Sequence, residues 1–160
     1  MNIYLIRHGE AEPTLENKPH EFRGLTESGI QTTRASAEFW KNFINGFEII
    51  LTSPLKRAKQ TAEIIHNIFN VKSEVAEEIS LLNGGLTEDL LSIAELLDMK
   101  DIAMVGHQPD IGIHIAAMIG ANDANFKIPP SSLTKIHFRE NPGVAKGILE
   151  ILLPPINKNG

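Results

Sequence analysis

The sequence contains no cysteine, and this absence removes several kinds of site at once. A chain without thiols forms no disulfide framework, binds no zinc through cysteine and uses no thiolate as a nucleophile. Cysteine-based phosphatase chemistry is therefore excluded. The lack of cysteine is also compatible with the cytosol, and we expect a cytoplasmic protein.

Long apolar runs and an excess of basic residues are also lacking. No apolar run reaches the roughly 18 residues that a membrane-spanning helix needs, and the start of the chain lacks the pattern of a signal peptide. The formal net charge is −5, whereas binding to a nucleic-acid backbone requires a basic face. We therefore expect neither a membrane nor a nucleic acid as partner.

Short apolar runs alternate with helical patterns along the chain of 160 residues, which suits a single domain over residues 1–160. This alternation predicts an α/β fold of three layers, in which helices cover both faces of a mixed, mostly parallel sheet. The expected strands are Ile3–Arg7, Glu48–Thr52, Ser73–Ile79, Ala103–Gly106, Leu133–Phe138 and Gly147–Leu153. The expected helices run from Thr26, as N-cap, to about Ile44; from Ser53, as N-cap, with Pro54 at the first helical position; from about Thr87 to Leu97; and from Pro109 to Gly120.

Charged or imidazole side chains stand where three of the expected strands end. Arg7 ends the first strand and His8 follows it, Arg57 follows the second strand by a few residues, and His107 follows the fourth. Ligands of open α/β sheets bind at the carboxyl ends of the strands. If these strands are parallel neighbours, the four side chains share one crevice, and two helix N-termini add positive dipole ends.

Such a crevice suits a phosphoryl group. Two arginines can hold its oxygens through paired hydrogen bonds, and His107 adds a further donor. His8 can attack phosphorus as a covalent nucleophile, and Arg7 beside it favours the reactive neutral imidazole. We predict a phosphohistidine intermediate that water hydrolyses. No phosphate-binding loop ending in Gly-Lys-Ser or Gly-Lys-Thr is present, and arginines would repel a metal ion, so no metal and no other cofactor is expected.

Four stretches resemble the histidine phosphatase superfamily of phosphoglycerate-mutase-like enzymes: LIRHGEAEP, GLTESGIQ, LTSPLKRAKQTAEII and MVGHQPDI. Their order and spacing match over residues 3–112. The chain is most similar to the small SixA-type phosphohistidine phosphatases, which also carry a Pro-Pro segment before a late strand, as in IPPSSLTKIHF. The resemblance implies a phosphoglycerate-mutase-like fold, His8 as the nucleophile, and Arg7, Arg57 and His107 as phosphoryl-binding residues.

The sequence departs from the larger members of this family in two ways. Those members carry a glutamate after the third strand that protonates an oxygen leaving group, but EEISLLNGGLTEDL matches no such motif here. They also insert a lid, where this chain has only the short turn Leu82–Thr87. We name Glu10 and Glu78 as possible acids. The open site favours a phosphorylated side chain on another protein.

Other polar residues have weaker expected roles. Ser53 is predicted to cap a helix and to lie near the phosphate, and Arg23, before GLTESG, is a candidate for substrate binding. The remaining histidines are expected at the surface or in structural roles; they are His20, His66, His114 and His137.

We therefore predict a phosphatase acting on phosphohistidine of a protein, such as a histidine phosphotransfer domain, and working as a monomer. The alternatives are a small-molecule phosphomonoesterase or a phosphoserine/threonine phosphatase of the same superfamily, and a non-catalytic phosphate-binding module. The His8→Ala variant distinguishes the last from an enzyme, because a binding module could keep its affinity for phosphate.

Overall fold

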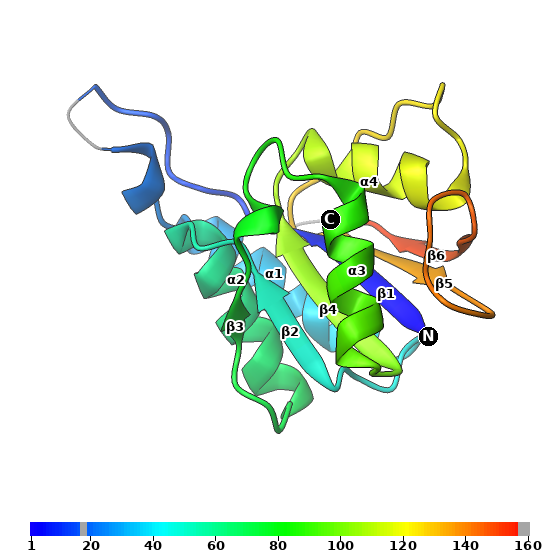
Figure 1. The fold of residues 1–160 in the computed structure, drawn as a ribbon. Coiled ribbons are helices and arrows are strands. Elements are labelled where there is room, and N and C mark those ends of the chain that lie inside the picture. The colour runs from blue at the N-terminus through cyan, green and yellow to red at the C-terminus, as the bar shows by residue number, and fades with distance from the viewer. Residues whose placement is uncertain (17–18, 157–160) are drawn as a thin grey trace.

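The computed structural model describes residues 1–16 and 19–156 (Figure 1). Six strands form one sheet, and four α-helices and two short 3-10 helices connect them. The elements are β1 (Asn2–Arg7), η1 (His20–Phe22), α1 (Glu27–Trp40), β2 (Ile49–Thr52), α2 (Lys56–Phe69), β3 (Ala76–Glu77), η2 (Ile79–Leu81), α3 (Thr87–Leu97), β4 (Asp101–Gly106), α4 (Asp110–Ile119), β5 (Leu133–His137) and β6 (Ile148–Leu153).

The sheet has the strand order β3-β2-β4-β1-β5-β6. Strands β3, β2, β4 and β1 are parallel neighbours, whereas β5 pairs antiparallel with both β1 and β6. The predicted mixed, mostly parallel sheet is confirmed. The three strands with continuous apolar runs lie at its centre, because both of their faces are covered, and the more alternating β5 and β6 lie toward an edge.

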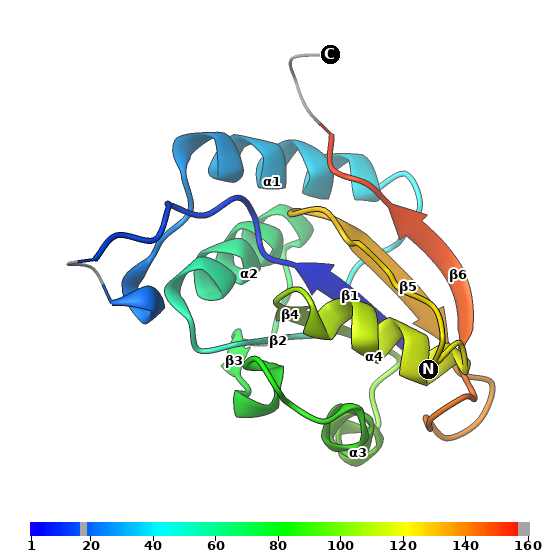
Figure 2. The ribbon, with the colours of Figure 1, turned by 90° about the horizontal axis from the view of Figure 1, so that it is seen from above.

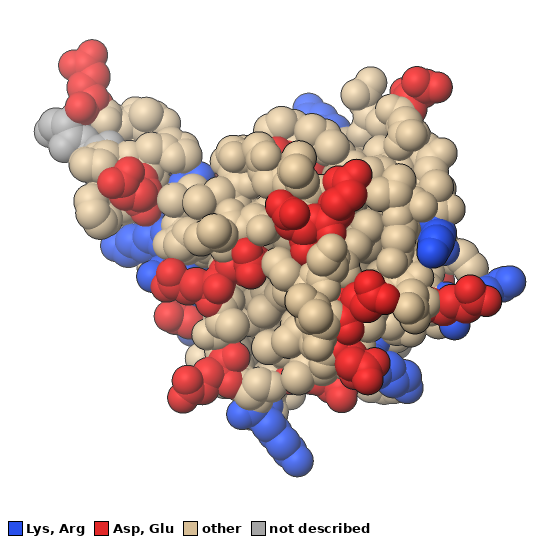
Figure 3. Space-filling model, viewed as in Figure 1, with Lys and Arg blue, Asp and Glu red and all other residues tan. Residues whose placement is uncertain are grey.

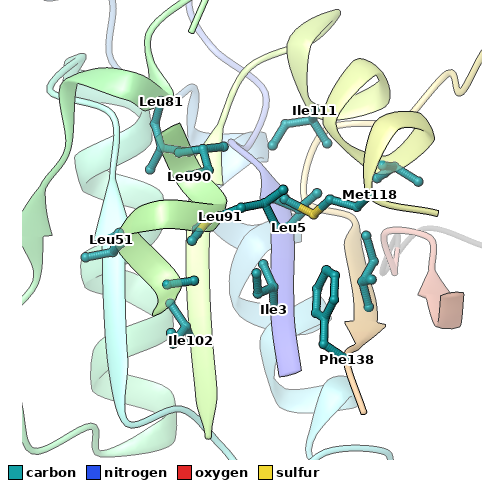
Figure 4. Packing of buried hydrophobic residues seen from close by; sticks show 14 of the residues in the cluster. Ile3, Leu5, Leu51, Leu81, Leu90, Leu91, Ile102, Ile111, Met118 and Phe138 are labelled. Atoms are coloured by element: carbon teal, nitrogen blue, oxygen red, sulfur yellow. The ribbon is translucent and has the colours of Figure 1, made fainter. Parts of the chain in front are cut away.

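Helices cover both faces of the sheet, as Figure 2 shows. On one face, α3 and α4 pack over β1 and β4 through a buried apolar cluster that includes Leu5, Leu90 and Met104 (Figure 4). On the other face, α1 and α2 pack through a second cluster around Trp40, which is fully buried. The apolar stripe of each helix thus faces the sheet, as the period of about 3.6 residues requires.

Most boundaries lie within two residues of the prediction, and the elements β3, α1 and α2 show the differences that matter most. β3 covers only Ala76–Glu77 of the predicted 73–79 strand, because it pairs with β2 alone and the chain then turns into η2. α1 ends at Trp40 rather than near Ile44. α2 begins at Lys56 with Leu55 as its N-cap, so the predictions that Ser53 caps this helix and that Pro54 opens it are wrong.

Residues 10–16 and 19–24 belong to an arm that leaves the sheet after β1 and carries η1 (Figure 1). A bridge between Ala11 and Leu25 closes its base. Thr26 caps α1 as predicted, because its hydroxyl accepts a hydrogen bond from the backbone N–H of Gly29 at 2.9 Å. Among the described residues, no helix has the length and hydropathy of a membrane span.

Candidate active site

The carboxyl ends of β2, β4 and β1 meet at one edge of the sheet. Arg7 lies opposite Gly106 in the β1–β4 register, and Thr52 lies opposite Val105 in the β2–β4 register. The residues that follow these strands therefore converge, and they border a crevice of about 270 Å³. Its described lining residues are Arg7, His8, His20, Arg23, Arg57, Asn83, His107 and Gln108.

Two glycines let the chain after β1 pass close to helix α1. A Cβ added to Gly9 would lie 2.5 Å from the Thr33 hydroxyl oxygen, and one added to Gly29 would lie 2.1 Å from the Glu10 carbonyl oxygen. The Gly9 N–H donates to the Thr61 hydroxyl on α2 at 3.0 Å. His8 is thus held between β1 and two helices by close backbone packing.

The hydrogen bonds of His8 fix which ring nitrogen is unprotonated. Its Nδ1 lies 2.7 Å from the Gly9 carbonyl oxygen, which can only accept, so Nδ1 carries the hydrogen. Nε2 then has a lone pair, and the Arg57 Nε–H donates to it at 3.2 Å. Burial, and then the charges of Arg57 and Arg7, lower the pKa of His8 to about 4. The imidazole is therefore neutral near pH 7, with Nε2 as its nucleophilic atom.

His107 lies beside His8, with 5.0 Å between the ring centroids, and is 3% exposed. Its Nε2 is 2.7 Å from the hydroxyl oxygen of Ser53, while its buried Nδ1 has no hydrogen-bond partner. The Leu55 N–H donates to the same hydroxyl oxygen at 3.4 Å, and this arrangement leaves the Ser53 hydroxyl hydrogen able to donate to His107 Nε2. Burial and the neighbouring His8 and Arg57 lower the pKa of His107 to about 3, so the ring is neutral near pH 7. In the tautomer that accepts from Ser53, it presents Nδ1–H as a donor.

The arginines are anchored by backbone carbonyl groups. Arg7 donates from Nη1 to the Ile128 oxygen at 2.7 Å, and Arg57 donates from Nη1 to the His20 oxygen at 3.2 Å. Arg23 donates from Nε to the Glu12 oxygen at 2.6 Å. Arg7 Nε is buried without a partner. Since buried donors are rarely left unpaired, Arg7 Nε and His107 Nδ1 together indicate a place for a hydrogen-bond acceptor such as a phosphoryl oxygen.

The structure brings together most of the predicted site residues. Arg7, His8, Arg57 and His107 line the crevice, and so does Arg23 on the arm. Ser53 does not line it; the side chain is fully buried and contacts the site through His107.

The two possible acids are not among the described residues that line the crevice. Glu10 accepts from the Thr26 hydroxyl at 2.8 Å, and Glu78 accepts from the Ser80 N–H at 2.8 Å, where it caps η2. The described lining residues include no carboxylate. Over residues 1–16 and 19–156, no group of histidine and carboxylate side chains has a metal-binding arrangement.

Sequence reasoning missed three lining residues. His20 was expected in a surface or structural role, and no periodicity in the arm signals that η1 turns it toward the crevice. Asn83 belongs to the turn before α3, which Asp110 holds by accepting from Asn83 Nδ2 at 2.8 Å and from the Gly84 N–H at 2.9 Å. Gln108 directly follows His107 in the sequence, so its position at the crevice could have been predicted.

The chain is similar in sequence to other known proteins. It is 28% identical over 121 residues to the phosphohistidine phosphatase SixA of Escherichia coli strain K12, with 74% of each protein covered. It is 33% identical over 119 residues to an uncharacterised protein of Picosynechococcus, covering 70% of this chain and 69% of that one.

Solved structures show the same fold. The protein histidine phosphatase SixA complexed with tungstate superposes with a TM-score of 0.84 at 21% identity, covering 96% of this chain and 97% of that one. A phosphoserine phosphatase mutant of Entamoeba histolytica gives a TM-score of 0.72 at 21% identity, covering 95% and 96%.

A family model is matched over more than half of the chain. The model describes the histidine phosphatase superfamily (branch 1), and the match covers residues 3–95, from β1 through most of α3. The phosphoglycerate-mutase-like fold expected from the sequence is therefore confirmed. The chain belongs to branch 1 of the histidine phosphatase superfamily.

Proposed function

We propose that this protein hydrolyses phosphohistidine on a protein substrate through a covalent intermediate on His8. The observation that carries the proposal is the state of the His8 ring: Nδ1 donates to the Gly9 carbonyl and Nε2 has a lone pair beside the Arg57 guanidinium. A neutral imidazole in a cationic crevice can approach a phosphoryl dianion, whose charge the arginines balance.

Binding comes first. The phosphoryl oxygens take hydrogen bonds from Arg57, which turns from His8 Nε2 to the ligand, from Arg7 Nε and from His107 Nδ1. The last two donors have no other hydrogen-bond partner, so they break no bond within the protein when they turn to the ligand. Arg23 adds positive charge at the rim.

Phosphoryl transfer follows. The His8 Nε2 lone pair attacks phosphorus while the bond from phosphorus to the substrate imidazole breaks, and that imidazole nitrogen keeps the electron pair. If the far nitrogen of the substrate ring carries a proton, the ring leaves as neutral imidazole and needs no acid from the protein. An alkoxide leaving group instead gains roughly 10²- to 10⁴-fold from a general acid. A crevice with no carboxylate among its described lining residues therefore favours a P–N bond over an ester.

Hydrolysis of the intermediate uses the same tautomer. Phosphorylated His8 keeps the hydrogen on Nδ1, which still donates to the Gly9 carbonyl oxygen. The phosphorylated ring is therefore a cation and a good leaving group. Water attacks phosphorus, the bond to Nε2 breaks with its electrons returning to Nε2, and both hydrogens of the water stay on the product as dihydrogen phosphate, which loses one to the solvent. Inorganic phosphate and neutral His8 result.

The proposal is tested with a histidine-phosphorylated phosphotransfer domain. We expect the wild type to release phosphate and His8→Ala to release none. His66→Ala is a matched control, because His66 lies on α2 nine residues beyond Arg57, about 13 Å along the helix. Quenching at neutral pH followed by mass spectrometry should find phosphate on the peptide containing His8. Release of phosphate by His8→Ala at the wild-type rate would contradict the mechanism.

Phosphate esters provide the second arm of this test. Faster turnover of phosphoserine or of sugar phosphates than of the phosphorylated domain would show that the enzyme prefers a phosphate ester to a substrate with a P–N bond. Affinity for phosphate without turnover of any substrate would indicate a binding module.

A further inference from the structure

A second hollow adjoins the crevice. It is a groove of about 370 Å³ between α4 and the loop formed by residues 121–128, which is yellow in Figure 1. This volume is within the range of about 300–1,000 Å³ that is usual for ligand pockets. Ile113 and Ala117 on α4 line one wall, and Ala124 and Phe126 on the loop line the other.

Close packing at the start of α4 builds the floor of this groove. A Cβ added to Gly112 would lie 2.5 Å from the Phe126 carbonyl oxygen, so a glycine is needed for the loop to approach the helix. The same carbonyl oxygen accepts from Gln108 Nε2 at 2.7 Å. The loop is thus fastened to the residue that follows His107.

Gln108 lines both the groove and the catalytic crevice. Since its Nε2 faces the Phe126 carbonyl, the amide orientation is fixed and Oε1 points away from that carbonyl. Oε1 is buried and has no hydrogen-bond partner. Gln108 thus joins the two hollows, and its unpaired amide oxygen lies below their surface.

The groove also exposes apolar surface. Ile113 is 56% exposed although it lies on a helix whose other apolar side chains are mostly buried. On the other side of the crevice, the arm exposes Phe22, which is 58% exposed. Figure 3 shows the surface hollowed between this arm and the helical body, so the region is open to a large partner.

We propose, on the basis of the proposed function, that the groove binds an apolar side chain of the protein substrate that lies close to its phosphohistidine. The phosphoryl group enters the crevice, the adjoining segment of the substrate passes over Gln108, and an aliphatic or aromatic side chain of that segment fills the groove against Ile113 and Phe126. The groove thereby selects phosphorylated proteins over free phosphohistidine.

Two substrates test this inference. Initial rates are measured with a histidine-phosphorylated phosphotransfer domain and with the free amino acid phosphohistidine. Ile113→Glu places a charge in one wall, and Ala124→Trp fills the groove from the other; both side chains are exposed, so the fold tolerates the changes. Leu96→Glu on α3, 85% exposed, is the matched control.

We expect Ile113→Glu and Ala124→Trp to lower kcat/KM for the domain by about ten- to a hundredfold, since burial of one apolar side chain has this order of effect. Rates with free phosphohistidine should stay within about twofold, and Leu96→Glu should affect neither substrate. Unchanged rates with the domain for both groove variants would overturn the inference while leaving the proposed function intact. A wild-type dimer that Ile113→Glu dissociates would assign the groove to a second copy and would also overturn it. A wild type that hydrolyses neither substrate would refute the proposed function, and the inference with it.

Discussion

The two crevice imidazoles should make the stability of this protein strongly dependent on pH between 5 and 7.5. The pKa of His8 is lowered to about 4 and that of His107 to about 3, in each case mainly by burial. Their ring centroids are 5.0 Å apart, and two unit charges at that distance repel by about 3 kcal/mol at an effective dielectric constant of about 20. Both rings therefore stay neutral in the folded state at pH 5.

The direction in which the free energy of unfolding changes with pH follows from proton binding. An unfolded histidine has a pKa near 6.5 and is protonated at pH 5, whereas the folded rings are not, so the unfolded state binds more protons and stability falls as pH falls below about 6.5. For either ring alone, the stability lost between pH 7.5 and pH 5 is about 2 kcal/mol. The loss attributable to the pair is about 4 kcal/mol, a large share of the 5–15 kcal/mol that is usual for a domain.

Urea unfolding of the wild type, His8→Gln and His107→Gln at pH 7.5 and pH 5 measures this quantity. Each variant should lose about 2 kcal/mol less than the wild type over this interval, because one imidazole no longer takes up a proton on unfolding. Other ionisable groups contribute equally to all three proteins and cancel. Equal losses in the wild type and in both variants would show that the rings titrate as ordinary histidines, and the assignment of His8 as neutral by burial would be wrong.

Three further predictions concern the role of Arg57 in binding the phosphoryl group, the close backbone packing at Gly29 and the independence of activity from metal ions. Arg57→Lys should lower kcat/KM about 10- to 100-fold with an unchanged circular dichroism spectrum. Lysine cannot replace the guanidinium, which contacts both His8 Nε2 and the His20 carbonyl. Full activity of this variant would show that the Arg57 guanidinium is not needed to bind the phosphoryl group. Gly29→Ala should lower the unfolding free energy by about 1–3 kcal/mol in urea titrations, because its Cβ would lie 2.1 Å from the Glu10 carbonyl oxygen, and unchanged stability would show that the backbone relaxes freely. Treatment with a chelator should leave phosphate release unchanged, because no step of the mechanism requires a metal; loss restored by zinc or magnesium would refute it.

The fold and the centre of the site could be predicted because they depend on local signals. Continuous apolar runs mark β1, β2 and β4, and a cationic or imidazole side chain follows each of them within a few residues. Parallel pairing then brings Arg7, His8, Arg57 and His107 together without further information. The start of α2 could not be predicted, because Ser53 has the local pattern of a cap but its hydroxyl serves His107, a residue 54 positions away.

The rim of the crevice depends on contacts between segments that carry no periodic signal. His20 reaches the site because Arg57 holds its carbonyl oxygen, and Asn83 because Asp110 holds the turn before α3. Neither of these hydrogen-bonded contacts can be predicted from the sequence, because a polar loop can adopt many conformations until tertiary contacts select one. The same reason accounts for the two expected acids, which have the right residue type but bond to Thr26 and Ser80.

The charge of the crevice is opposite in sign to that of the whole chain, and this difference bears on how an anionic substrate binds. The chain has a formal net charge of −5, and acidic side chains are spread over the face shown in Figure 3. At physiological ionic strength the Debye length is about 8 Å, so carboxylates farther away than this contribute little at the crevice. Arg7, Arg23 and Arg57 line the crevice itself, where their charges would act at contact distance on the phosphoryl group of the proposed substrate. Because the two imidazoles are neutral, the site offers guanidinium charge to an anion while keeping His8 Nε2 free of a proton, which is the combination that the proposed mechanism requires.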